Sequence, residues 1–455
     1  MGQTELGETL RFAIDQRCHA KLLRKSLELA ERCGTLGEID EMRFHAALRK
    51  EAKRLSRVGA FFYSEDLDFH QSLGWRTPSG RARIAVTTVT VTTMTRPKNA
   101  KSTARVEQTY SPSWWLPGPH ARTIWGRFFR RTPPIVTRTE RWDTDDGDFL
   151  DVVRLEGKPG NPRLVMLHGL EGAPRSHYAR GLFLEAARRG WSADLLLFRG
   201  CGAEPNRNAR FYHSGETGDV SAVARRLLAE DPEVLLVFAG VSLGGNVLLK
   251  WLGELEESVP PRIVAAAAVS VPFDLERASR HIDHGFAQVY QRHFLKSLRR
   301  KALAKLDRFP GLVSRDRVEA ARTLYDFDDA VTAPVHGFEN AADYYSRSSS
   351  IRFLERIRIP TLLLSAVDDP FLPSEVLATV QETVQHNRNI VVEFPELGGH
   401  VGFVSGQNPF RPFYYAEWRV ARFLEGAIEA YRRPSGALRS TIAGHDDRNH
   451  HLKRR

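Results

Sequence analysis

The feature that most constrains this chain is the segment Gly240–Gly244, which reads Gly-Val-Ser-Leu-Gly. An apolar run with the composition of a buried strand, Val234–Ala239, precedes it, and an apolar helix-like segment, Val247–Leu252, follows it. Glycines on both sides of the serine permit a tight turn from strand to helix that lifts the hydroxyl away from the backbone. The motif therefore predicts that Ser242 is a nucleophile. The alternative is a glycine-flanked turn in which the serine only caps the helix.

Strands and helices alternate on both sides of this motif. Apolar runs predict further strands at 149–155, 163–167, 193–198, 263–271, 359–365 and 390–394, and helical spacing predicts helices at 179–187, 220–228 and 414–431. Such alternation is typical of a mostly parallel sheet with helices on both faces. The sequence thus predicts an α/β fold.

The alternation stops over residues 275–357, which are basic and have leucines at helical spacing. An insertion of this kind, placed before the last two strands, predicts a helical cap over the carboxyl edge of the sheet, where ligands of such sheets bind. We expect the α/β domain to span residues 106–432. Residues 1–105 are predicted to be a helical, partly disordered extension without a recognisable role, and residues 433–455 a disordered charged tail.

A serine nucleophile needs a base and a carboxylate that orients the base. His400 lies in a glycine-rich loop just after the last predicted strand, in the chain order nucleophile, acid, histidine. Asp368 and Asp369 both follow the strand at 359–365. We predict Asp369 as the acid because of its distance from that strand, and Asp368 is its rival. The aspartate that does not contact the histidine would have a turn or capping role.

The oxyanion that forms during attack on a carbonyl needs two hydrogen-bond donors. The first predicted donor is the backbone N–H of Leu243, directly after the nucleophile. The second is the N–H of Leu170, in the loop that follows His168 and Gly169. His168 is predicted to be a structural residue of that loop.

Two further segments carry notable residues. The polar stretch 198–219 is predicted to brace the oxyanion side of the site, and Cys201 within it to be structural. The aromatic, proline-rich arm at 113–129 either packs onto the core, which we favour, or contacts a membrane surface.

Seven ordered motifs carry a family resemblance: Trp114–His120, His168–Gly172, Arg199–Gly202, Tyr212–Gly215, Val241–Asn246, Asp368–Phe371 and Gly398–Phe403. With them, the chain from about Tyr110 to about Tyr431 resembles the YheT-like hydrolases. This family is part of the type-4 group of the AB hydrolase superfamily and is related to eukaryotic α/β-hydrolase-domain lipases. The resemblance implies an α/β-hydrolase fold, a Ser242–Asp369–His400 triad, and esterase or lipase activity on short- to medium-chain esters. Some relatives act on phospholipids or transfer acyl groups to alcohols.

The chain is therefore expected to hydrolyse carboxylic esters or acylglycerol-type lipids without a metal or organic cofactor. The alternatives are an acyltransferase, a phospholipase or a non-catalytic binding protein. The net charge of +11 is scattered and accompanies no nucleic-acid-binding motif, so it predicts at most weak attraction to anionic lipid and no nucleic-acid partner. No obligate protein partner is expected. Three cysteines and the lack of a signal-peptide pattern favour a cytoplasmic setting.

Overall fold

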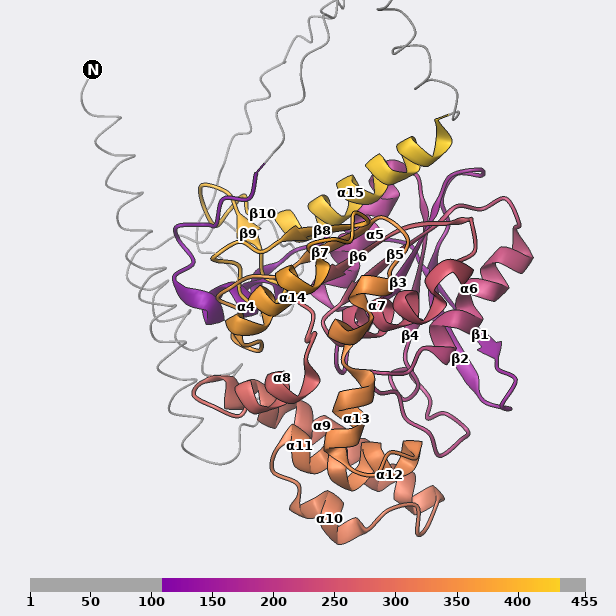
Figure 1. The fold of residues 1–455 in the computed structure, drawn as a ribbon, viewed down its shortest axis with the longest axis vertical. Helices are drawn as coiled ribbons and strands as arrows, with labels where there is room; N and C mark the ends of the chain where they lie inside the picture. The colour runs from indigo at the N-terminus through magenta and orange to yellow at the C-terminus, as the bar shows by residue number, and fades with distance from the viewer. Residues whose placement is uncertain (1–108, 434–455) are drawn as a thin grey trace, which may run out of the picture. The chain divides into compact units, whose positions relative to one another are not determined.

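The computed structural model describes residues 109–433 (Figure 1). The predictions for residues 1–105 and for the tail after Arg433 lie outside the described residues.

One sheet of eight strands organises the described chain, in the spatial order β1-β2-β4-β3-β5-β6-β7-β8. Its strands are β1 (Arg138–Asp143), β2 (Phe149–Leu155), β3 (Arg163–Leu167), β4 (Ser192–Leu197), β5 (Leu236–Val241), β6 (Ile263–Val269), β7 (Thr361–Leu364) and β8 (Ile390–Glu393). The six strands from β4 to β8 in this order are parallel, whereas β2 is antiparallel to both β1 and β4. The predicted α/β fold with a mostly parallel sheet is confirmed.

Strand β1 was not among the predicted strands, and its position explains why. It lies at the edge of the sheet, and only Trp142 of its six residues is buried. Its sequence, Arg-Thr-Glu-Arg-Trp-Asp, therefore lacks the apolar run by which the central strands are recognised. A short two-stranded sheet, β9 (Val404–Ser405) with β10 (Phe413–Tyr414), was also not predicted.

Helices cover both faces of the large sheet (Figure 1). One face packs against α6 (Gly218–Glu230), α7 (Leu243–Leu255) and α14 (Ser374–Val384). The other packs against α5 (His177–Arg189) and α15 (Tyr415–Arg432). A further helix, α4 (Gly118–Phe129), belongs to the aromatic arm that precedes the sheet. Because both faces are covered, every residue of β2, β4, β5 and β6 is buried, as a continuous apolar run predicts.

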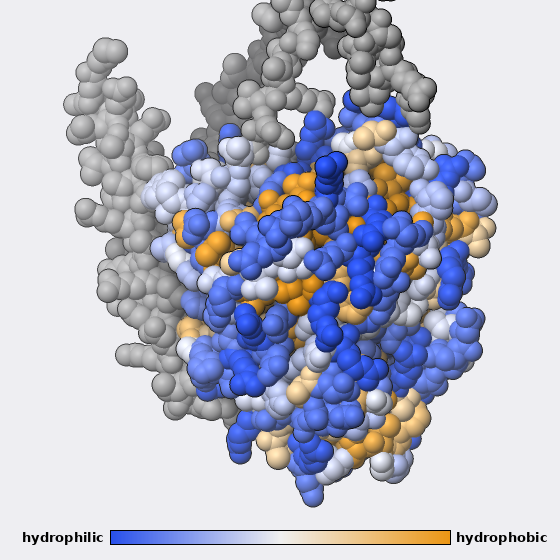
Figure 2. Space-filling view, viewed as in Figure 1, coloured by the Kyte–Doolittle hydropathy of each residue, from blue (hydrophilic) through white to orange (hydrophobic). Residues whose placement is uncertain are grey.

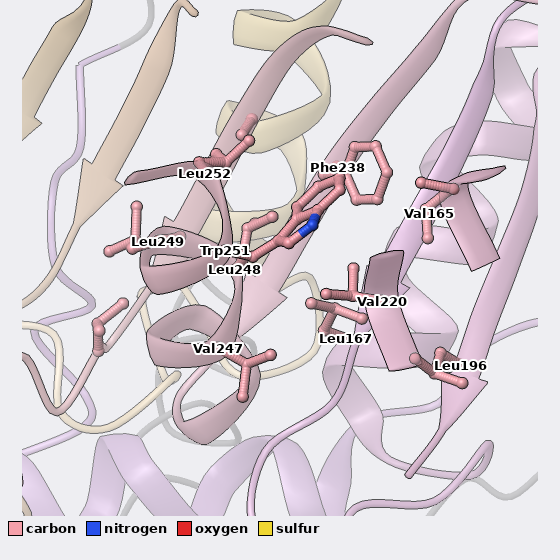
Figure 3. Packing of buried hydrophobic residues seen from close by; sticks show 14 of the residues in the cluster. Val165, Leu167, Leu196, Val220, Phe238, Val247, Leu248, Leu249, Trp251 and Leu252 are labelled. Atoms are coloured by element: carbon pink, nitrogen blue, oxygen red, sulfur yellow. The ribbon is translucent and has the colours of Figure 1, made fainter. Parts of the chain in front are cut away.

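The strand and helix on either side of Ser242 are held together by large buried side chains (Figure 3). The ring of Phe238 in β5 lies 5.0 Å from that of Trp251 in α7, and Val247, Leu248 and other apolar residues of α7 complete the contact. Each such side chain contributes roughly 1.5–3 kcal/mol when it is fully buried. The turn between β5 and α7 is thus anchored by packing on both sides.

Between β6 and β7 the chain is almost entirely helical. It forms α8 (Leu275–His281), α9 (Ala287–Arg308), α10 (Arg315–Ala320), α11 (Leu324–Phe327), a π-helical turn η2 (Asp328–Thr332), α12 (Ala333–His336), α13 (Ala341–Ser348) and a 3₁₀ segment η3 (Ser350–Arg356). Helices α9 to α13 gather beyond one end of the sheet (Figure 1). They have a small core of their own, which includes Leu295, Leu306, Val318, Phe327 and Val331.

The face of the described chain in view is mainly hydrophilic, with separate hydrophobic patches (Figure 2). Within residues 109–433, none of the helices combines the length and the apolar character that crossing a membrane requires.

The two glycines of the Gly-Val-Ser-Leu-Gly segment are required by close backbone contacts. A Cβ on Gly244 would lie 2.4 Å from the carbonyl oxygen of Leu167 and 2.5 Å from that of His168. A Cβ on Gly240 would lie 2.5 Å from the carbonyl oxygen of Gly244. Backbone atoms cannot move aside as the end of a side chain can, so α7 begins this close to β3 only because these residues are glycines.

We predict that Gly244→Ala lowers the free energy of unfolding by about 1–3 kcal/mol, because the added methyl group meets backbone on β3. Gly426→Ala in α15 is the matched control, since its Cβ would meet no atom within 4 Å. The control should be neutral or stabilise by up to about 1 kcal/mol through its higher helix propensity. Urea unfolding of the two variants measures the difference. Equal stability of Gly244→Ala and Gly426→Ala would contradict the steric argument.

Candidate active site

Ser242 lies at the tip of the turn between β5 and α7, in a strained backbone conformation. Its φ is 54° and its ψ −121°, a left-handed region that non-glycine residues rarely adopt. Such a conformation costs on the order of 1–3 kcal/mol and persists only where the surroundings enforce it. Here the packing of β5 against α7 enforces it, and the amide of Ser242 donates to the carbonyl of Val269 at 2.8 Å. The side chain is half-buried, so its hydroxyl is held in one place at the carboxyl edge of the sheet.

His400 contacts Ser242 across 158 residues of sequence, with its Nε2 3.1 Å from the Ser242 Oγ. The other ring nitrogen, Nδ1, lies 2.8 Å and 3.1 Å from the two carboxylate oxygens of Asp369. Since a carboxylate only accepts hydrogen bonds, Nδ1 carries the ring hydrogen and donates a hydrogen bond to Asp369. Nε2 is therefore the nitrogen with a free lone pair, and it faces the serine hydroxyl. This arrangement can accept a proton from Ser242 as its oxygen attacks a carbonyl carbon.

The two neighbouring aspartates have different partners. Asp369 is buried and contacts the imidazole, and it also accepts from the amide of Phe371 at 2.9 Å. Asp368 does not contact the imidazole. Its Oδ1 accepts from the amides of Gly398 and Gly399 at 2.6 and 2.8 Å. Asp368 thus holds the loop in which His400 lies, whereas Asp369 holds the ring itself.

The aromatic arm supplies two more contacts to that loop. The Oγ1 of Thr123 in α4 accepts from the amide of His400 at 2.9 Å, and Arg122 forms an ion pair with Asp368 at 3.0 Å. On the opposite side, the Oγ of Ser270, which follows β6, accepts from the amide of Val401 at 3.0 Å. These three residues could not be recognised in the sequence, because no motif or spacing marks a hydroxyl or guanidinium group that binds a distant segment.

The arm itself packs onto the segment that follows His400. Trp115, Leu116 and Trp125 form a buried cluster with Val404, and the indole N–H of Trp115 donates to the carbonyl of Gly406 at 3.0 Å. This is the packing role that the sequence favoured for the arm. The arm also fixes the backbone of the loop that carries His400, a role that the sequence did not predict.

An aromatic ring covers the candidate base. The ring of Phe371 stacks on the imidazole of His400, with centroids 4.1 Å apart and planes 18° apart. The stacking and the bond to Asp369 together leave the imidazole one orientation, with Nε2 toward Ser242.

The loop after β3 brings a second candidate element close to the nucleophile. A Cβ on Gly169 would lie 3.1 Å from the Cβ of Ser242, so only a glycine fits comfortably there. Three of the four amides from 169 to 172 are already engaged, with the hydroxyls of Tyr178 and Tyr212 and with the Gly169 carbonyl. The amide of Leu170 has no hydrogen-bond partner among the described residues, and neither has that of Leu243. These are the two amides that the sequence predicted as oxyanion donors.

His168 is buried beneath this loop, and its hydrogen bonds give it a structural role, as predicted. Its Nε2 accepts from the amide of Phe198 at 3.1 Å, so Nδ1 carries the proton and donates to the Gly169 carbonyl at 2.8 Å. Burial lowers the pKa of His168 to about 4, so the ring is neutral at pH 7.

The polar stretch after β4 forms a buried network, in agreement with its predicted bracing role. The guanidinium of Arg199 binds Asp219 at 2.8 Å and Asp148 at 3.1 Å. The amide group of Asn206 donates to Asp148 at 3.1 Å and to the carbonyl of Phe149 at 2.7 Å. Cys201 is mostly buried in the same stretch, and burial raises its pKa to about 12, which keeps it a thiol.

In the described part of the chain, neither a candidate metal site nor the groove along α15 lies at Ser242. Within residues 109–433, no three His, Cys, Asp or Glu side chains are grouped so that they could hold a metal ion. A groove of about 590 Å³ lies along α15 and is lined by Val264, Pro360 and Phe423 among others. Val264 and Pro360 mark the beginnings of β6 and β7, so this groove is at the opposite end of the strands from Ser242.

We predict that replacing Asp369 mainly lowers kcat, whereas replacing Asp368 mainly lowers the free energy of unfolding. Asp369→Asn should lower kcat by roughly 10³–10⁴-fold with little loss of stability, because an amide no longer favours the required tautomer of His400. Asp368→Ala should instead lower the free energy of unfolding by about 1.5–3 kcal/mol, because it removes charged hydrogen bonds to the loop. Steady-state kinetics and urea unfolding of both variants separate the two effects. A larger loss of kcat per folded molecule in Asp368→Ala than in Asp369→Asn would reverse the assignment.

Comparisons with known proteins identify the family of the chain. The family model described as the alpha/beta hydrolase fold matches residues 162–407. The chain is 39% identical over 316 residues to YheT of Escherichia coli, a protein assigned as an esterase, covering 68% of this chain and 91% of that protein. It is 27% identical over 333 residues to phospholipase ABHD3 of Mus musculus, covering 71% and 80%. It is 29% identical over 283 residues to a monoacylglycerol lipase of Saccharomyces cerevisiae, covering 60% and 61%.

The family match extends over more than half of the chain, and nearly the whole of the Escherichia coli protein is covered at 39% identity. Together with the eight-stranded sheet and the serine turn after β5, these similarities mean that the chain belongs to the YheT-like branch of the alpha/beta hydrolase fold family.

Proposed function

We propose that this chain is a serine hydrolase that cleaves carboxylic esters through an acyl-enzyme on Ser242. The observation that carries the proposal is the continuous line of hydrogen bonds from Asp369 through His400 to Ser242. The relatives support the reaction class, since proteins named esterase, phospholipase and monoacylglycerol lipase all act on ester bonds.

In the first half of the reaction, the Oγ of Ser242 attacks the ester carbonyl carbon while Nε2 of His400 takes the hydroxyl proton. Asp369 stabilises the imidazolium that results. The carbonyl oxygen becomes an oxyanion, which the amides of Leu170 and Leu243 bind. When the intermediate collapses, the bond to the alcohol breaks and His400 gives its proton to the leaving oxygen.

In the second half, water attacks the acyl-enzyme with His400 again as the base, and the carboxylic acid leaves while Ser242 regains its proton. No metal or organic cofactor takes part in this scheme. The substrates we propose are short- to medium-chain acyl esters or acylglycerol-type lipids. We further propose a cytoplasmic location and at most weak contact with anionic membranes, on the basis of the few cysteines and the scattered positive charge.

We predict that Ser242→Ala abolishes hydrolysis of p-nitrophenyl esters that the wild type cleaves, since the variant lacks the attacking oxygen. A series from acetate to palmitate would also give the preferred acyl length. Ser221→Ala, in α6, is a control for the loss of a serine hydroxyl elsewhere and should keep wild-type activity.

A fluorophosphonate probe gives an independent check, because it should label wild type at Ser242 in a 1:1 ratio and leave Ser242→Ala unlabelled. Equal turnover by Ser242→Ala and wild type would overturn the proposal. Formation of ethyl esters when ethanol competes with water would indicate acyl transfer to alcohols.

A further inference from the structure

Glu171 has an unusual backbone conformation directly beside the proposed oxyanion donor Leu170. Its φ is 54°, in the left-handed region that non-glycine residues seldom occupy. Its amide donates to the hydroxyl of Tyr212 at 2.9 Å. A conformation of this kind persists only when surrounding contacts hold it. Because Leu170 directly precedes Glu171, the contacts that hold Glu171 also restrict the loop that carries the Leu170 amide.

The Glu171 carboxylate is the centre of those contacts. Its Oε1 accepts from the Tyr212 hydroxyl at 3.0 Å and from the Nζ of Lys301 at 2.7 Å, and its Oε2 accepts from the Oγ of Ser297. Tyr212 thus binds both the amide and the carboxylate of one residue, which closes a ring around the strained backbone. The Glu171 side chain is only 11% exposed, so solvent screens the Lys301 ion pair weakly.

Two of these three donors, Ser297 and Lys301, come from α9, and α9 also reaches the other half of the site. The rings of Tyr290 and Phe294 lie 4.8 and 6.1 Å from that of Phe371, the residue that stacks on His400. The same helix thus contacts the base side through aromatic rings and the oxyanion side through Glu171.

We propose that Glu171 is a positioning residue for catalysis: its carboxylate, bound by Lys301 and Ser297 of α9, holds the loop so that the Leu170 amide faces the forming oxyanion. Glu171 itself does not touch the substrate. The inference rests on the proposed function, because it assigns a role within the oxyanion site of that reaction. It also makes the position of α9 a determinant of turnover.

A purely structural role is the competing explanation, in which the Glu171–Lys301 contact only ties the helical insertion to the sheet. The two explanations predict different effects on kcat per active site and on the fraction of folded enzyme. A misplaced Leu170 amide weakens binding of the tetrahedral intermediate and lowers kcat per active site, with KM nearly unchanged. A structural defect lowers the fraction of folded enzyme, and each remaining active site turns over normally.

The experiment compares Glu171→Ala, Lys301→Met and Lys301→Arg with wild type in the full chain. Lys296→Met is the matched control, because Lys296 is exposed on the same helix and its replacement removes the same charge. Titration with a fluorophosphonate counts the active sites in each preparation. For each variant, kcat and KM for the best p-nitrophenyl ester are then measured per titrated site, together with Ki for an alkyl trifluoromethyl ketone, which forms a tetrahedral adduct with the serine.

We expect Glu171→Ala and Lys301→Met to lower kcat about 10- to 100-fold, less than the roughly 10²–10³-fold lost when an oxyanion donor is removed outright. KM should change little, and Ki for the ketone should rise by about the same factor as kcat falls. Lys301→Arg should restore most of the rate, because it keeps a cation in reach of Glu171. Lys296→Met should match wild type.

Unchanged kcat per titrated site in both Glu171→Ala and Lys301→Met would overturn the inference while leaving the proposed function intact. A rise in KM at constant kcat would also overturn it, since that pattern belongs to ground-state binding. A wild type that neither reacts with the fluorophosphonate nor cleaves any ester would instead overturn the proposed function, and the inference with it.

Discussion

The candidate site depends on one constraint above all, the close approach of α7 to the ends of β3 and β5. The glycines at 240 and 244 permit that approach, and the buried rings of Phe238 and Trp251 hold it. The turn between strand and helix must then be very short, and Ser242 takes up the strain as a positive φ. The same approach brings the loop after β3, which carries the proposed Leu170 donor, next to the serine.

The base is positioned in a different way, because His400 lies in a loop instead of at the tip of a packed turn. Hydrogen bonds from three separate parts of the chain hold the loop backbone: Thr123 of the arm, Ser270 after β6 and Asp368 after β7. Asp369 and Phe371 then fix the ring. This division explains why two adjacent aspartates are present. One sets where the loop lies, and the other sets which nitrogen of the imidazole faces the serine.

Much of this could be predicted from the sequence, and the exceptions have a common physical cause. Central strands are recognised because burial on both faces requires apolar runs, and Ser242 because a tight turn requires glycines. Strand β1 was not predicted because an edge strand can be polar. The sequence does not predict the roles of Thr123, Arg122 and Ser270, because their contacts join segments more than 100 residues apart. Hydroxyl and guanidinium groups also occur throughout the chain, so their presence alone marks no site. The sequence favoured Asp369 over Asp368 by its distance from the preceding strand, and the structure gives the contacts that distinguish them: Asp369 meets the imidazole, and Asp368 meets the loop amides.

Helix α9 contacts both halves of the site, the side of the base His400 and the side of the proposed oxyanion donor Leu170. The rings of Tyr290 and Phe294 lie against Phe371, which stacks on the imidazole of His400. Further along the same helix, Lys301 holds the carboxylate of Glu171. A shift of α9 would therefore act on contacts to both the base side and the oxyanion side, because one helix serves both. Under the proposed role of Glu171, turnover depends on the position of α9 through both sets of contacts.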